Sequence, residues 1–192
     1  MIVLVRHGQT PYNTELRMQG QLDIPLSDEG RRQARVLGER IKTEGARFDA
    51  LYSSRLSRAV ETARIIGEYL GLEPQTVDGL EELNFGCFQG HTFKEIPTLF
   101  PEMFAEFERT GTDSAPHGGE TGREVFDRAR LALLSLPEAG KGRALVVSHG
   151  AVIGFIRAYL NGVPLKDMRD FIPGNAETVE LGKAELKKLR EA

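Results

Sequence analysis

Residues 2–8 read Ile-Val-Leu-Val-Arg-His-Gly, and residues 144–150 read Ala-Leu-Val-Val-Ser-His-Gly. Each stretch opens with a short β-branched run, typical of a strand buried in a sheet, and closes on His-Gly. Similar runs at 50–53 and 75–77 alternate with helical patterns, and 177–181 is suited to an edge strand. The alternation predicts an α/β fold, a three-layer α/β/α sandwich with a mainly parallel sheet and one antiparallel edge.

Helices are expected between these strands because apolar residues recur there at helical spacing. Ser27 is suited to cap the first helix, and Ser54 or Ser57 the second. Residues 121–124 read Thr-Gly-Arg-Glu, which predicts a capping box at the start of another. The Lys-rich segment 183–192 fits either a hairpin partner or a frayed helix.

Between residues 85 and 119 the composition changes. Pro97 and Pro101 keep any helix in this segment short. We expect a helical lid inserted into a single domain that spans residues 1–192, although aromatic residues at such a position also fit plain core. Six of the chain's ten Phe lie here: Phe85, Phe88, Phe93, Phe100, Phe104 and Phe107.

The composition is that of an ordinary globular protein. The chain has 192 residues, and 25 Lys and Arg against 28 Asp and Glu leave a net charge of −3. A nucleic-acid-binding protein usually carries a basic excess, so no nucleic-acid partner is expected. Cys87 is the single cysteine, which excludes a disulfide framework and a cysteine-based zinc site. No targeting or membrane-spanning segment is apparent, and a cytoplasmic location is expected.

The carboxyl ends of parallel strands meet at one edge of a sheet, where α/β proteins bind ligands. Arg6 and His7 follow the first strand, and His149 follows the strand 144–148. Arg55 and Arg58 follow the strand 50–53. Arginines and histidines that converge on one point require an anion, and guanidinium groups clamp phosphate oxygens in pairs. The sequence therefore predicts a phosphate site at this edge.

A phosphate site with a neutral histidine can also carry out chemistry. An imidazole is a competent nucleophile toward phosphorus, and Gly150 opens a helix whose backbone amides would add donors. Protonation of the leaving oxygen requires an acid, for which Glu81 and Glu82 are the best-placed residues. The residues alone do not choose between Glu81 and Glu82, nor between Arg55 and Arg58.

Four stretches, in order along the chain, resemble the motifs of the histidine phosphatase superfamily, also called the phosphoglycerate mutase-like family. Residues 4–10, Leu-Val-Arg-His-Gly-Gln-Thr, are similar to its signature, and residues 53–59, Ser-Ser-Arg-Leu-Ser-Arg-Ala, to its second motif. Glu82 with Phe85-Gly86 resembles the third, and residues 148–150 the last. The resemblance covers most of the chain and implies a phosphoglycerate mutase-like fold.

The resemblance also implies roles. His7 would take the phosphoryl group, Glu82 would serve as proton donor and then as base, and neither a metal nor a cofactor is implied. Arg55 stands where many members carry Pro, and we expect it to be solvated. The remaining implied residues bind phosphate oxygens or lie near the substrate: Arg6, Arg58, His149, Asn13, Gln19, Gly20 and Gly150.

Other kinds of active site fit poorly. A cysteine phosphatase built on Cys87 would need an arginine six positions on, where Phe93 stands, so Cys87 is expected to be a packed thiol. Val146 occupies the place of the first glycine of a serine-hydrolase elbow. No histidine pair has metal-ligand spacing on a helix, and His91 and His117 are expected at the surface.

These observations predict an enzyme that hydrolyses a small phosphorylated metabolite through a phosphohistidine. A phosphoglycerate mutase is the alternative within the family, because the same groups could return the phosphoryl group to a bound glycerate. The alternative, if the protein is not an enzyme, is a module that binds a phosphorylated ligand without turnover. The sequence leaves open whether the protein is a monomer or a homodimer.

Overall fold

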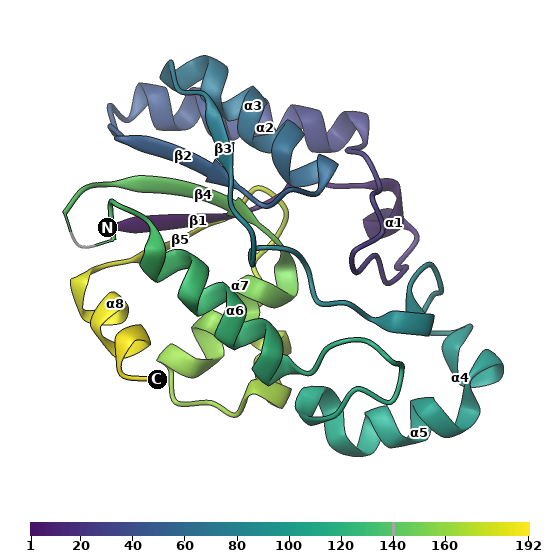
Figure 1. Ribbon diagram of the computed structural model, residues 1–192. Coiled ribbons are helices and arrows are strands. Elements are labelled where there is room, and N and C mark those ends of the chain that lie inside the picture. Colours follow the sequence, from purple (N-terminus) through teal and green to yellow (C-terminus); the bar gives the residue numbers. More distant parts are fainter. Residues whose placement is uncertain (140) are drawn as a thin grey trace.

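The computed structural model describes residues 1–139 and 141–192, and these contain a five-stranded mixed sheet with the order β3-β2-β4-β1-β5 (Figure 1). β1, β4, β2 and β3 are parallel, and β5 pairs antiparallel with β1. The predicted fold class and antiparallel edge are therefore confirmed. The strands are β1 Ile2–Arg6, β2 Ala50–Ser53, β3 Pro74–Thr76, β4 Ala144–Ser148 and β5 Thr178–Leu181.

Helices fill the connections. The α-helices are α1 Pro11–Thr14, α2 Asp28–Thr43, α3 Ser57–Leu70, α4 Ile96–Leu99, α5 Pro101–Thr110, α6 Gly122–Ser135, α7 Gly150–Leu160 and α8 Lys183–Arg190. The 3₁₀ segments are η1 Gly86–Phe88, η2 Gly111–Asp113 and η3 Leu165–Phe171. The Lys-rich segment thus forms a helix and not a hairpin partner.

Helix caps follow the predictions with one exception. Ser27 accepts a hydrogen bond from the Gly30 amide, and Thr121 forms the capping box with Glu124. The prediction that Ser54 or Ser57 caps α3 is wrong, since the capping residue is Leu56 and no side chain caps this helix. Ser57 is already the first helical residue, and the hydroxyl of Ser54 faces His149.

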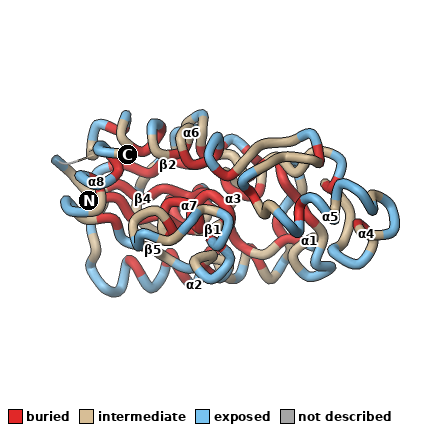
Figure 2. The backbone as a smooth tube through the Cα atoms, turned by 90° about the horizontal axis from the view of Figure 1, so that it is seen from below, coloured by how far each residue is buried: buried red, intermediate tan, exposed pale blue. Residues whose placement is uncertain are grey.

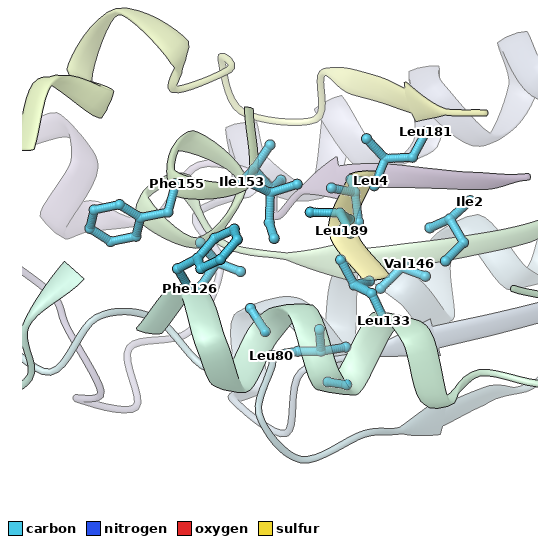
Figure 3. Close-up of a cluster of buried hydrophobic side chains, with 14 of the residues drawn as sticks. Ile2, Leu4, Leu80, Phe126, Leu133, Val146, Ile153, Phe155, Leu181 and Leu189 are labelled. Carbon is cyan, nitrogen blue, oxygen red and sulfur yellow. The ribbon is translucent and has the colours of Figure 1, made fainter. Parts of the chain in front are cut away.

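Alternation along the strands builds two cores, one on each face of the sheet. Ile2 and Leu4 of β1 point toward α6, α7 and α8, whereas Val3 and Val5 point toward α2 and α3. Figure 3 shows the first core, where Leu4 lies near Ile153 and Leu189. In Figure 1, α2 and α3 cover one face of the sheet and α6, α7 and α8 the other. These cores fix the positions of the strand ends.

The inserted segment Gly86–Asp113 lies beyond the carboxyl ends of the strands, where Figures 1 and 2 show α4 and α5 extending away from the sheet. It has a small core of its own, to which Met18 contributes. Five of the six phenylalanines noted above join this core, and Phe93 is 45% exposed. The segment is therefore a helical insertion that is internally packed, with one phenylalanine left at its surface.

Candidate active site

The two His-Gly stretches meet at the carboxyl edge of the sheet. Arg6 is in register with Ser148 across the β1–β4 pair, and the His7 amide donates to the Ser148 carbonyl at 3.0 Å. The imidazole rings of His7 and His149 lie 5.2 Å apart between centroids. Adjacent parallel strands therefore place the two histidines side by side, as expected.

His7 is buried and held in one orientation. Its Nδ1 lies 2.7 Å from the Gly8 carbonyl oxygen, so Nδ1 carries the proton and Nε2 has a free lone pair. The Gly8 amide donates to Thr62 Oγ1 at 3.0 Å, which anchors the turn after β1. Burial, with the nearby Arg58 charge, holds the pKa of His7 well below its usual range. A neutral ring is the form required of a nucleophile.

His149 is also buried and is held in the same Nδ1-protonated tautomer as His7, but through a contact at its other ring nitrogen. Its Nε2 lies 2.8 Å from Ser54 Oγ, which itself accepts a weak hydrogen bond of 3.4 Å from the Leu56 amide. The hydroxyl proton of Ser54 is thus available to Nε2, which leaves the ring proton on Nδ1. That Nδ1 has no hydrogen-bond partner among the described residues. Burial, with the Arg58 charge, also lowers the pKa of His149 strongly.

Arg58 is a completely buried charge at the start of α3. Its Nη1 and Nη2 donate to the carbonyls of Leu22 and Gly20, each at 2.7 Å, and its Nε has no partner in the described chain. Burial lowers the pKa of Arg58 to about 10, so the group remains charged at neutral pH. Gly20 accepts one of these bonds with φ of +51°, a conformation that favours glycine.

Arg6 approaches the same point from β1. Its Nη1 donates to the Pro173 carbonyl at 2.7 Å, while its Nε is buried without a partner in residues 1–139 and 141–192. A Cβ atom at Gly150 would lie 3.3 Å from Arg6 Nε, so the glycine keeps the space beside the guanidinium open. Burial lowers the pKa of Arg6, and Glu82 partly offsets this effect.

The structure separates the two glutamates that the sequence could not. Glu82 lines the same cavity as His7, and its carboxylate accepts from the Leu83 and Ala151 amides at 2.9 and 3.3 Å. Glu81 instead accepts from the Gly79 amide at 2.8 Å and pairs with Arg55 at 2.6 Å. Of the pair, only Glu82 borders the cavity.

Arg55 and Arg58 are separated in the same way. Arg58 borders the cavity, whereas Arg55 is exposed, as expected, and forms ion pairs with Asp78 and Glu81. Its charge is therefore neutralised outside the cavity. The difference from the proline usual in the family thus adds a surface ion-pair network and no contact to the site.

The loop residues suggested by the resemblance border the same cavity. Gln19 Oε1 accepts from the Thr10 hydroxyl at 2.8 Å, and Asn13 Oδ1 accepts from the Thr10 amide at 3.0 Å. Both side chains are therefore engaged with α1 and the turn before it. Gly20 and Gly150 also lie on the cavity wall.

Asn175, between η3 and β5, is a cavity residue that the sequence analysis missed. Its Nδ2 donates to the His7 carbonyl at 2.9 Å and lies 3.4 Å from Asn13 Oδ1. The next residue, Ala176, has φ of +58° and donates its amide to the Arg6 carbonyl at 2.9 Å. The segment before β5 thus supports the backbone of both Arg6 and His7. The Gly-Asn-Ala sequence is typical of a turn, but it does not indicate which backbone groups that turn contacts.

Two expectations about single residues are wrong. His117 is 3% exposed, and its ring packs against Phe88 with centroids 5.3 Å apart while Nδ1 accepts from the Gly119 amide. The Cys87 amide donates to the His117 carbonyl, which folds this loop against the insertion. Cys87 itself is exposed, with its Sγ 3.7 Å from Met103 Sδ, because the turn at η1 directs Phe88 inward in its place.

The cavity has a volume of about 1220 Å³ and extends from His7 to the insertion and η3. In the described part of the chain, no group of three or more His, Cys, Asp or Glu side chains is placed to hold a metal ion. Among the described helices, none combines the length and apolar character needed to cross a bilayer.

Comparison with known proteins agrees with this geometry. The family model for the histidine phosphatase superfamily (branch 1) matches residues 2–188. A phosphoglycerate mutase-like protein 4 of Arabidopsis thaliana is 42% identical over 155 residues, which cover 79% of this chain and 67% of the relative.

Solved structures of phosphatases have the same fold. A mycobacterial glucosyl-3-phosphoglycerate phosphatase superposes with a TM-score of 0.77 at 34% identity, over 92% of this chain and 87% of the other. The α-ribazole phosphatase of Shigella flexneri superposes with a TM-score of 0.81 at 25% identity, over the same shares. Since the family model matches nearly the whole chain and the fold is the same, the chain belongs to the histidine phosphatase superfamily, branch 1.

Proposed function

We propose that the protein hydrolyses phosphomonoesters through a phosphohistidine at His7. One observation carries this proposal: the nitrogens Arg6 Nε, Arg58 Nε and His149 Nδ1 are buried around His7 without partners in the described residues. Buried donors without partners cost free energy, and three of them match the equatorial oxygens of a phosphoryl group. The free-energy cost of these unpaired donors is offset when they bind the oxygens of a phosphate.

In the first step, the lone pair of His7 Nε2 attacks phosphorus opposite the ester oxygen. The N–P bond forms, the P–O bond breaks, and the leaving oxygen takes a proton from Glu82. Arg6, Arg58 and His149 stabilise the charge on the transferring group. The bond from His7 Nδ1 to Gly8 keeps Nε2 directed at phosphorus.

In the second step, the Glu82 carboxylate takes a proton from water, and the water oxygen bonds to phosphorus. The N–P electron pair returns to His7 Nε2, and phosphate leaves. Glu82 is protonated again and His7 is neutral, so the cycle closes. No metal ion is required, and we expect the reaction to continue in the presence of EDTA. In this proposal residues 1–192 act as one domain, with 85–119 as its lid.

A phosphoglycerate mutase is the second candidate, supported by the name of the Arabidopsis relative. It would use the same phosphohistidine and return the phosphoryl group to a second hydroxyl. The two solved phosphatase structures of the same fold favour hydrolysis. A module that only binds phosphate would not require a proton donor at the position of Glu82, which argues against that alternative.

The test is phosphate release from p-nitrophenyl phosphate with EDTA, together with isomerisation of 3-phosphoglycerate with a bisphosphoglycerate primer. We expect release that His7→Ala abolishes. Rapid quenching should trap a phosphoenzyme that is stable in base and labile in acid, as a phosphohistidine is. Isomerisation without release would favour the mutase. Neither reaction, with tight binding of inorganic phosphate retained, would favour the binding module.

A further inference from the structure

The cavity extends far beyond the space that a phosphate group requires. Its volume of about 1220 Å³ exceeds the roughly 300–1,000 Å³ of sites that take drug-sized ligands. A phosphate with a three-carbon body would occupy only the floor beside Arg6 and Arg58. The remaining space is bordered by the insertion, by η3 and by the α1 segment with Tyr12, Leu16 and Arg17, and the insertion and η3 supply most of its charged side chains.

The insertion presents one aromatic face to this space. Phe93 borders the cavity and is 45% exposed, whereas Phe104 and Phe107 also border it but pack in the core of the insertion. The Arg169 guanidinium of η3 lies 5.4 Å from the centre of the Phe93 ring. This pair therefore joins the two walls and leaves an apolar surface exposed beside a hydrogen-bond donor.

The outer wall of the cavity, formed by the insertion and η3, carries equal numbers of positively and negatively charged side chains. The cationic residues are Arg109, Lys166 and Arg169, and the anionic residues are Glu108, Asp167 and Asp170. None of the six forms an ion pair with another residue of the described chain. The wall thus offers both free donors and free acceptors.

This mixture of charged side chains favours some substrates over others, according to the groups on the part of the substrate beyond the phosphate. Carboxylates only accept hydrogen bonds, Lys and Arg only donate, and a hydroxyl does both. A second phosphate or carboxylate could pair with the three cations but would leave the three anions beside it without donors, and an apolar body would remove water from all six. A body with several hydroxyls can be satisfied by both kinds of side chain.

We propose that the substrate is the phosphomonoester of a polyhydroxylated, sugar-like ring. The apolar C–H face of the ring packs on Phe93, and its hydroxyls bind the charged side chains of the outer wall. This inference rests on the phosphatase activity proposed above and specifies the substrate class for it.

The test compares four esters that differ in one property at a time. Glycerol 3-phosphate lacks a ring, cyclohexylmethyl phosphate has a ring without hydroxyls, glucose 6-phosphate has both, and glucose 1,6-bisphosphate adds a second phosphate. We expect kcat/KM for glucose 6-phosphate to exceed each of the others by about tenfold or more, which corresponds to one hydrogen bond to a charged group.

Two variants test the wall itself. Phe93→Ala should lower kcat/KM for glucose 6-phosphate about tenfold and leave glycerol 3-phosphate unchanged, because the small ester does not reach that wall. Asp170→Asn should lower kcat/KM for glucose 6-phosphate and raise it for the bisphosphate, a reversal that a structural defect would not cause. Arg143→Gln is the matched control, because Arg143 stacks on Phe48 at 4.7 Å outside the cavity.

The outcomes separate the two proposals. Equal kcat/KM for the four esters, or a preference for the cyclohexyl or bisphosphate ester, would overturn the sugar-like substrate and leave the phosphatase intact. No release from these esters or from p-nitrophenyl phosphate would overturn both. A Phe93→Ala variant that loses activity equally on every ester would show that Phe93 supports the fold and not the substrate.

Discussion

His149 Nε2 and Ser54 Oγ lie 2.8 Å apart, and this contact determines which nitrogen of His149 faces the phosphate pocket. Ser54→Ala should lower kcat/KM about tenfold, because the proton of His149 would no longer be held on Nδ1. Steady-state hydrolysis of p-nitrophenyl phosphate measures the effect. Ser53→Ala is a close control, since Ser53 Oγ is buried without a partner in the described chain and should be dispensable. Equal losses in the two variants would disprove the role of Ser54.

Glu82→Gln should reduce kcat by about 10²–10⁴-fold, because an amide cannot donate the required proton. Glu81→Gln provides the matched control. It removes a charge one residue away that pairs with Arg55 outside the cavity, so we expect less than a twofold change in kcat. Phosphate binding, measured by calorimetry, should survive in both variants. Similar kcat values for the two would exclude Glu82 as the acid.

Arg58→Lys should raise KM and lower kcat, because the three donors of an ammonium group sit on one nitrogen and cannot span the Gly20 and Leu22 carbonyls and the phosphate as the planar guanidinium does. We expect a loss of about 10²-fold in kcat/KM. The same change at exposed Arg55 should leave kcat/KM within twofold. Kinetics of both variants, with circular dichroism as a check on folding, provide the comparison.

Asn175→Ala should lower kcat with little change in KM, because Asn175 supports the His7 backbone. A loss of about tenfold is expected, in line with the cost of misplacing a reacting group. Single-turnover phosphorylation of His7 separates this effect from product release. A change in KM alone would instead indicate that Asn175 contacts substrate.

Stability should fall as the pH decreases through the usual range of histidine. Burial lowers the pKa of His7, His149 and His117 in the folded protein. Below about pH 6.5 the unfolded chain therefore binds protons that the folded chain does not, and each such histidine costs up to about 1.4 kcal/mol per pH unit.

Urea unfolding at pH 7.5 and 5.5 measures this dependence. The free energy of unfolding should be smaller at pH 5.5. His117→Asn should weaken the dependence, because asparagine can accept the Gly119 hydrogen bond without titrating. A wild-type stability that is the same at both pH values would contradict the prediction.

Much of the fold could be predicted because its signals are local. Ile2–Arg6 and Ala144–Ser148 are continuous apolar runs, and strands of a parallel sheet covered on both faces require them. His7 and His149 could be placed together because each follows such a strand.

What could not be predicted depends on contacts between distant segments. Glu81 and Glu82 are chemically identical neighbours, and they differ only through partners such as Arg55 and Ala151. His117 is buried because its loop folds against the insertion, for which a polar, glycine-rich sequence gives no sign. Asn175 acts through the backbone of a residue far away in sequence, and a local pattern cannot reveal that.

The position of β1 in the sheet has a consequence for synthesis on the ribosome. β1 lies between β4 and β5, so Ile2 pairs with Ala144 on one side and Leu181 on the other. Both partners are made more than a hundred residues after β1, and such long-range pairing slows folding. In a nascent chain, the strand that precedes His7 would therefore remain unpaired until β4 and β5 emerge. The active site should thus form late and in one cooperative step. Chaperones could therefore bind the exposed apolar β1 before the protein is able to bind its substrate.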